Sequence, residues 1–133
     1  MNIQTHELID PRLCGRPLSV APGFSRIELK TDEAMQVDDF GLVHGGFIFG
    51  LADHAAMLAV NHPHVVLAGA DVKFLKPVKA GDAVVAEASV AESMGKKHVV
   101  AVTVRRGEEP VFTGDFICFV LDRHVLAQAK AQG

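Results

Sequence analysis

The stretch that decides the fold is GGFIFGLADHAAMLAV, residues 45–60. Its alanine, leucine and methionine residues favour a helix, and Asn61-His62-Pro63 supplies a stop signal directly after it. Apolar residues occur on almost every side of this helix, so it cannot lie on the surface with one side in water. We therefore expect the rest of the chain to wrap around it.

Segments on both sides of the helix have the character of β-strands. Residues 24–31 alternate apolar and charged side chains, which is the period of a strand with one wet face. After the helix, four stretches rich in valine, isoleucine, phenylalanine and threonine are predicted to be strands, at about residues 65–76, 83–92, 97–105 and 111–121. Short turn signals separate these four stretches, so successive strands should be antiparallel neighbours.

The two ends of the chain carry weaker signals. Before residue 24, proline-containing turns disfavour any long regular element, so we expect only a short turn or helix there. The tail from His124 has helical propensity. One apolar helix and about five antiparallel strands predict an α+β hotdog fold, in which a curled sheet wraps around the helix, within a single domain of residues 1–133.

The composition excludes several classes of protein. Hydrophobic residues make up 49% of the 133 residues and charged residues 22%, so the chain can bury a core. A net charge of -3 without a long basic run argues against a nucleic-acid partner. The sequence shows neither a signal peptide nor an apolar run that could span a bilayer, so we expect no membrane partner and a cytoplasmic location. Cys14 and Cys118 match no metal-binding spacing, and we expect reduced thiols.

Asp53 is the candidate catalytic residue. It is the one carboxylate within the predicted helix, and the residues one turn away, Phe49 and Met57, are apolar. An ionised carboxylate in such surroundings costs several kcal/mol unless it is paired or reaches a polar cavity. The alternative is that the helix has one solvent-facing stripe and that Asp53 lies on it.

The pair Gly45-Gly46 begins the helix just after His44. Backbone N–H groups in the first turn of a helix have no partner within the helix, and without a Cβ a substrate carbonyl can approach them closely. Such groups can act as an oxyanion hole. The alternative is that the glycines serve only a tight turn.

The stretch GLVHGGFIFGLAD, residues 41–53, resembles the signature of hotdog-fold acyl-CoA thioesterases. The resemblance is closest to the phenylacetate-degradation and 4-hydroxybenzoyl-CoA thioesterase type. It continues through DVKFLKP at residues 71–77, AGD at residues 80–82 and GKK at residues 95–97. It therefore covers most of the chain.

The resemblance implies a substrate and a set of site residues. The substrate would be an acyl-CoA thioester, CoA being part of the substrate, with no separate cofactor and no metal. Asp53 would act as general base or nucleophile, Gly45 would donate its amide to the thioester carbonyl with Gly46 beside it, and His44 would shape the turn. The site would form between two subunits, so the minimal unit is a homodimer, with a homotetramer as the larger assembly. Asp71 would assist in positioning water.

Lysine side chains are expected to bind the phosphates of CoA. Lys96 and Lys97 are the favoured pair because similar enzymes have basic residues at that turn.

Asp38 is a departure from the family pattern, which often has asparagine in the loop before the HGG turn. An asparagine can donate a hydrogen bond, whereas an ionised aspartate can only accept one. If Asp38 and Asp53 come close together, repulsion between the two charges should raise the pKa of one of them. The alternative is that Asp38 is a solvated loop residue beside Asp39.

The histidines suggest no metal site. His62 and His64 lack a third ligand nearby and are expected in a surface loop. His54 points about 100° away from Asp53 on the helix and is expected to pack or to contact a subunit. Two rival functions remain open, an acyl-CoA hydratase or dehydratase and a non-catalytic acyl-CoA sensor.

Overall fold

Residues 45–60 form helix α2 (Gly45–Val60) in the computed structural model, which describes residues 1–127 of the chain. The predicted bounds of the helix are confirmed. Asn61 ends the helix in the left-handed conformation, and its backbone N–H donates to the Met57 carbonyl oxygen. Nine of the sixteen α2 residues are buried, from Ile48 to Ala59, which explains why apolar residues occur on most of its sides.

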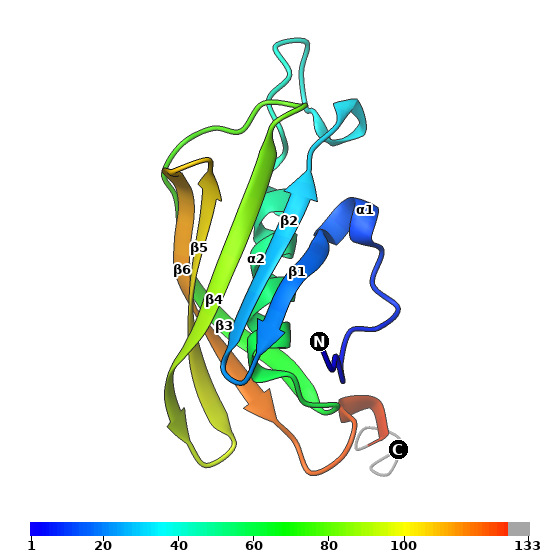
Figure 1. Ribbon diagram of the computed structural model, residues 1–133, viewed down its shortest axis with the longest axis vertical. Helices are drawn as coiled ribbons and strands as arrows, with labels where there is room; N and C mark the ends of the chain where they lie inside the picture. The colour runs from blue at the N-terminus through cyan, green and yellow to red at the C-terminus, as the bar shows by residue number, and fades with distance from the viewer. Residues whose placement is uncertain (128–133) are drawn as a thin grey trace.

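A single antiparallel sheet curls around α2 (Figure 1). The strand order in the sheet is β1-β2-β4-β5-β6-β3. The strands are β1 (Arg16–Ala21), β2 (Phe24–Lys30), β3 (Val65–Phe74), β4 (Ala83–Met94), β5 (Lys97–Arg106) and β6 (Glu109–Val120). The α+β hotdog architecture predicted from the sequence is therefore confirmed, and the sheet remains open.

The sequence-based prediction of about five strands did not include strand β1, and the sheet has six strands. The Arg16-Pro17 pair was interpreted as punctuation, yet it begins this strand. Strand β1 lies at the edge of the sheet, where a missing backbone N–H removes no hydrogen bond from a central ladder. The pairing with β2 also shifts register between Pro17 and Ser19. The short element expected before it is helix α1 (Pro11–Cys14).

The core lies between the concave face of the sheet and α2. Alternate residues of the central strands are fully buried there: Val84, Ala86, Ala88, Val100, Val102, Val104, Phe112 and Phe116. The Ser25 hydroxyl of β2 donates to the Ala55 carbonyl oxygen of α2 at 2.6 Å, which ties the helix to the sheet. The position of α2 is thus fixed by packing on one side and by a buried hydrogen bond.

Two regions outside the core bear on the predictions. Strand β3 is the other edge of the sheet, and its outer side is unpaired within residues 1–127. Most of the tail from His124, for which helical propensity was predicted, lies outside the described residues. Among residues 1–127, no helix has both the length and the apolar character that crossing a bilayer requires.

Candidate active site

Asp53 lies on the side of α2 that the sheet leaves partly open, together with Gly46, Phe49 and Gly50. The alternative of a solvent-facing stripe is therefore partly correct, but the carboxylate is not simply solvated. Its Oδ1 is buried and has no hydrogen-bond partner among residues 1–127. Burial raises the pKa of Asp53 from 3.8 to about 6. An unpaired carboxylate of this kind can take up and release a proton near neutral pH.

Two cysteines lie within electrostatic reach of Asp53. Burial, with smaller contributions from Asp10 and Asp53, raises the pKa of the Cys14 thiol. Burial and the charge of Asp53 raise the pKa of the Cys118 thiol to about 12. Both cysteines are free and protonated at neutral pH, in agreement with the prediction of reduced thiols. No pattern in the sequence indicates that the two thiols lie near Asp53.

The start of α2 presents one free backbone donor. His44 caps the helix, and its Nδ1 accepts a hydrogen bond from the Gly46 N–H at 2.7 Å. The Gly46 amide is therefore already used. The Gly45 N–H, in contrast, has no acceptor among residues 1–127. It can donate to an incoming oxygen, with the positive end of the helix dipole behind it.

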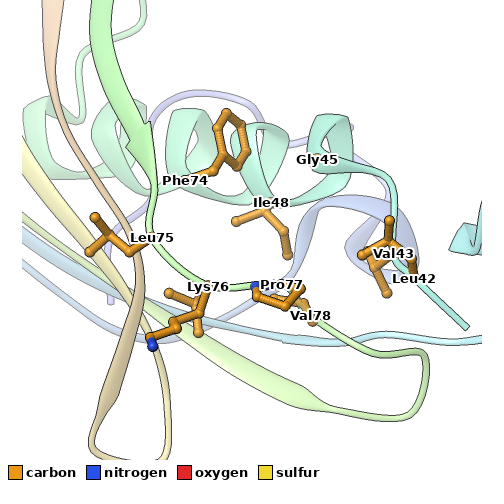
Figure 2. Close-up of a pocket in the computed structure, with 10 residues that line it drawn as sticks. Leu42, Val43, Gly45, Ile48, Phe74, Leu75, Lys76, Pro77 and Val78 are labelled. Carbon is orange, nitrogen blue, oxygen red and sulfur yellow. The ribbon is translucent and has the colours of Figure 1, made fainter.

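An apolar groove of about 280 Å³ begins at Gly45 (Figure 2). Phe74, at the end of β3, covers the glycine closely: a Cβ at position 45 would lie 3.1 Å from Phe74 Cε1. Ile48 of α2 and Val111 of β6 form part of the other walls. The rest comes from the segments before α2 and after β3: Leu42, Val43, Leu75, Lys76, Pro77 and Val78. The groove can hold an acyl chain whose carbonyl oxygen meets the Gly45 N–H.

Gly45 and Asp53 are too far apart to act on one carbonyl group within a single chain. They are eight residues apart on one helix, which corresponds to about 12 Å along its axis. Asp53 accordingly does not line the groove that begins at Gly45. A site that uses both groups must take them from two different helices.

Asp38 serves its own loop in this structure. Its exposed Oδ1 accepts from the backbone N–H groups of Phe40 and Leu42, at 3.0 and 3.2 Å. The pKa of Asp53 is raised by burial and not by repulsion from Asp38. The chain on its own thus favours the alternative in which Asp38 is a loop residue.

The remaining predicted site residues lie away from the groove. Asp71 is exposed on β3, opposite Asp115 of β6. Lys96 lies in the β4–β5 turn, where its ammonium pairs with Asp122 Oδ2 at 2.9 Å, and Lys97 begins β5. None of the three lines the groove beside Gly45.

His54 has a structural role within the chain. It is 2% exposed, and its Nδ1 lies 3.0 Å from the Cys14 carbonyl oxygen, to which it donates. Burial lowers its pKa, which keeps the ring neutral at neutral pH. The expectation that His54 packs against other structure and forms no dyad with Asp53 agrees with this bond to α1.

A family model described as the thioesterase superfamily matches residues 40–113, which is more than half of the chain. The chain belongs to the thioesterase superfamily. The matched region of this superfamily member includes the HGG turn, all of α2 and the groove from Leu42 to Val111. Both candidate groups, the Gly45 N–H and Asp53, therefore lie within it.

Curated relatives of this superfamily member are longer proteins. The chain is 56% identical over 123 residues to a methylthioribose-1-phosphate isomerase from Aquifex aeolicus. The matched residues make up 92% of this chain and 27% of that protein. It is 32% identical over 121 residues to the transcription factor FapR from Caldanaerobacter subterraneus. The matched residues make up 90% of this chain and 56% of FapR. The chain thus spans between about a quarter and about half of the length of these relatives.

Solved structures reproduce the fold. An uncharacterized protein from Pyrococcus horikoshii is 53% identical, with a TM-score of 0.94 over 95% of this chain and 97% of that one. The E. coli PaaI protein from the phenylacetic acid degradation operon is 22% identical, with a TM-score of 0.80 over 90% of this chain and 88% of that one. A hypothetical thioesterase from Streptococcus pneumoniae, solved with coenzyme A, is 20% identical, with a TM-score of 0.74 over 82% of this chain and 87% of that one. The last two comparisons establish a shared fold only.

Proposed function

We propose that this thioesterase-superfamily domain hydrolyses an acyl-CoA thioester at a site shared by two copies of the chain. Asp53 of one subunit acts as general base or nucleophile, and the Gly45 N–H of the other polarises the thioester carbonyl. The observation that carries the proposal is the buried, unpartnered Oδ1 of Asp53, a carboxylate with its pKa raised to about 6. Membership of the superfamily and the coenzyme A bound by the Streptococcus pneumoniae protein support the choice of substrate.

The shared site follows from the distance along α2. A second, antiparallel copy of the helix would bring its Gly45 close to Asp53 of the first copy, which no bending of one helix can do. The unpaired edge of β3 offers a place for a second copy to add its own strand. Phe40, which is 90% exposed, and Phe74, which is 55% exposed, are large apolar side chains that such an assembly would cover.

The chemistry requires no group that the chain lacks. Ionised Asp53 removes a proton from water as the water oxygen attacks the thioester carbon, or its own carboxylate attacks and water later hydrolyses the anhydride. The negative charge that develops on the carbonyl oxygen is stabilised by the Gly45 N–H. Collapse of the intermediate breaks the C–S bond, and the thiolate takes a proton to leave as CoA. With a pKa of about 6, Asp53 is mostly ionised at pH 7 and is more basic than an ordinary aspartate.

The test is release of free thiol from acetyl-, hexanoyl-, palmitoyl-, phenylacetyl- and hydroxybenzoyl-CoA. The wild-type protein should hydrolyse at least one of them, and Asp53→Asn should lose about 10²- to 10⁴-fold in rate. Elution of Asp53→Asn at the wild-type position in gel filtration is the control for assembly. Full activity in a correctly assembled Asp53→Asn would rule out the mechanism, and turnover of an enoyl-CoA without thiol release would indicate a hydratase instead.

A second candidate function is binding of an acyl-CoA without hydrolysis. It is favoured by the similarity to a transcription factor, FapR, over 90% of this chain. A binding domain would show saturable association with acyl-CoA in calorimetry and no thiol release from any member of the panel. The two candidates thus differ in a single assay.

A further inference from the structure

A second cavity, of about 300 Å³, lies between the N-terminal segment, residues 1–10, and the face of α2 that carries His54. The segment leads into α1, which contacts α2 (Figure 1). The floor of the cavity consists of buried residues: Gly15, His54 and Leu58. The walls and rim are formed by Ile3, His6, Glu7, Ile9, Pro11, Arg16 and Pro17. None of these residues lines the groove beside Gly45.

The walls of this cavity are fixed to the body of the domain. Asn61, at the end of α2, holds the N-terminal segment: its Nδ2 donates to the Asn2 carbonyl oxygen at 2.7 Å, and its Oδ1 accepts from the Gln4 N–H at 2.8 Å. On the floor, Gly15 has φ 94°, and a Cβ there would lie 2.7 Å from Leu51 Cδ1. The cavity therefore exists before any ligand arrives, as is usual for small-molecule sites.

His54 supplies the one polar side chain of the floor, and one of its two ring nitrogens is unused. Because Nδ1 donates to the Cys14 carbonyl oxygen, Nε2 of the neutral ring carries a lone pair and can only accept. Nε2 has no partner among residues 1–127, although the side chain is 2% exposed. In the same part of the chain, Asp53 Oδ1 is the one unpartnered side-chain atom that is fully enclosed, so His54 Nε2 is still reachable from the cavity. A ligand that donates a hydrogen bond would satisfy this acceptor.

The surroundings of His54 favour a neutral ligand. An anion would meet the lone pair of Nε2 without a donor beside it, and a cation would lose its hydration against the apolar walls. The two charged side chains at the rim, Glu7 and Arg16, have opposite signs and are exposed. Among residues 1–127 no three histidine, cysteine or acidic side chains lie close enough together to hold a metal ion. The ligand is thus an apolar molecule with one donor group.

The size of the cavity fits a single aromatic ring with a substituent. An apolar protein cavity of about 150 Å³ is large enough for benzene, and this one has about twice that volume. A rigid ring has no rotatable bonds to immobilise, so it loses less entropy on binding than an aliphatic chain of the same size. The flat faces of Pro11 and Pro17 and the side chain of Leu58 offer it apolar contacts.

We propose that this cavity is a binding site for a small phenol, whose O–H donates to His54 Nε2 and whose ring packs against the apolar walls. His54 is turned by about 100° around the helix axis from Asp53. A phenol bound here therefore leaves both Asp53 and the Gly45 groove free, and the site is separate from the proposed hydrolysis. The bound molecule would connect the N-terminal segment to α2 and stabilise the folded domain.

The first test is titration of the wild-type protein with phenol and with anisole, followed by amide chemical shifts in NMR. Anisole has the same ring and oxygen but no O–H, so phenol should bind roughly three- to tenfold more tightly, as expected for one hydrogen bond. The ¹⁵N resonance of His54 Nε2 should shift with phenol and not with anisole. His54→Phe should abolish the preference for phenol. Equal affinities for the two compounds in the wild type would overturn the proposal.

A pair of tryptophan substitutions tests the location without altering His54. Ile9 lines the cavity and is half-buried, so Ile9→Trp should fill the space and raise the Kd for phenol at least about tenfold. Leu8→Trp is the matched control: Leu8 is 101% exposed and does not line the cavity, so the Kd should stay within about twofold. Unchanged binding by Ile9→Trp, no binding of phenol by the wild type, or shifts that cluster around Gly45 instead of Leu58 would each overturn the proposal.

Discussion

His44 Nδ1 accepts a hydrogen bond from the Gly46 N–H at 2.7 Å, and this bond makes the two glycines of the HGG turn inequivalent. The Gly46 amide serves as part of the helix cap, while the Gly45 amide is left without a partner among residues 1–127. The sequence alone does not show which of the two glycines has the free amide. The proposed oxyanion donor is therefore one atom, the Gly45 nitrogen, and a single substitution can remove its N–H.

Gly45→Pro should remove that donor while preserving the helix. Proline is well tolerated as the first residue of a helix, where its missing N–H costs nothing. His44 already has φ -60° and ψ 131°, a conformation compatible with a following proline. We expect the rate of thioester hydrolysis to fall about 10²- to 10³-fold, as for loss of one oxyanion-hole donor. Steady-state thiol release measures the effect.

Gly45→Ala is the matched control for this substitution. It keeps the N–H and adds the same Cβ, which in both variants lies close to the Phe74 ring. Alanine should retain most of the activity that proline loses, apart from the cost of shifting Phe74. Equal losses in the two variants would show that the ring contact, and not the N–H, accounts for the effect.

Subunit complementation tests whether the site is shared. Asp53→Asn and Gly45→Pro should each be nearly inactive alone, but a heterodimer of the two pairs an intact Asp53 with an intact Gly45 in one of its two sites. After co-refolding at equal concentrations, half of the dimers are mixed, so the mixture should recover about a quarter of the wild-type activity. Each variant refolded alone is the control. A site contained within one chain predicts no recovery at all.

The sequence predicted the parts of the fold that depend on periodic apolar patterns. The bounds of α2 were correct because the stop signal at Asn61 is local and the apolar run is long. Strand β1 was missed because proline at an edge strand looks the same in sequence as proline in a turn.

The candidate site was predictable only in part. Asp53 was predicted to be the catalytic residue from its apolar neighbours in the sequence, and this role stays a prediction. The cover of Phe74 over Gly45 depends on a tertiary contact, which no local pattern contains.

The raised pKa of Asp53 predicts how the reaction depends on pH. A base or nucleophile must be ionised, so kcat/KM should fall about tenfold for each pH unit below about 6. An ordinary aspartate with a pKa of 3.8 would keep the rate constant down to about pH 4. Loss of thioester absorbance measured from pH 4.5 to pH 8 checks this, with circular dichroism as the control for folding. A flat profile down to pH 4.5 would exclude Asp53 as the group that must be ionised.

The same pKa predicts a pH dependence of stability. Because the pKa in the folded chain, about 6, lies above the unfolded value of 3.8, the folded state binds the proton more tightly. The corresponding stability is fully present below pH 3.8 and is lost as the pH rises to about 6. A shift of about two units corresponds to at most about 3 kcal/mol in the free energy of unfolding. Asp53→Asn is neutral at every pH and should not show this loss.

Urea unfolding of the wild type and Asp53→Asn at pH 4 and pH 7 measures the difference. At equal protein concentrations, other titrating groups contribute equally to both proteins and cancel in the comparison. Asp53→Asn should gain stability relative to the wild type between pH 4 and pH 7, by up to about 3 kcal/mol. The gain should accompany the loss of hydrolysis, because the buried, unpaired carboxylate that the proposed reaction would use is costly to the fold. A difference that stays constant with pH would mean that the carboxylate is solvated in the assembled protein.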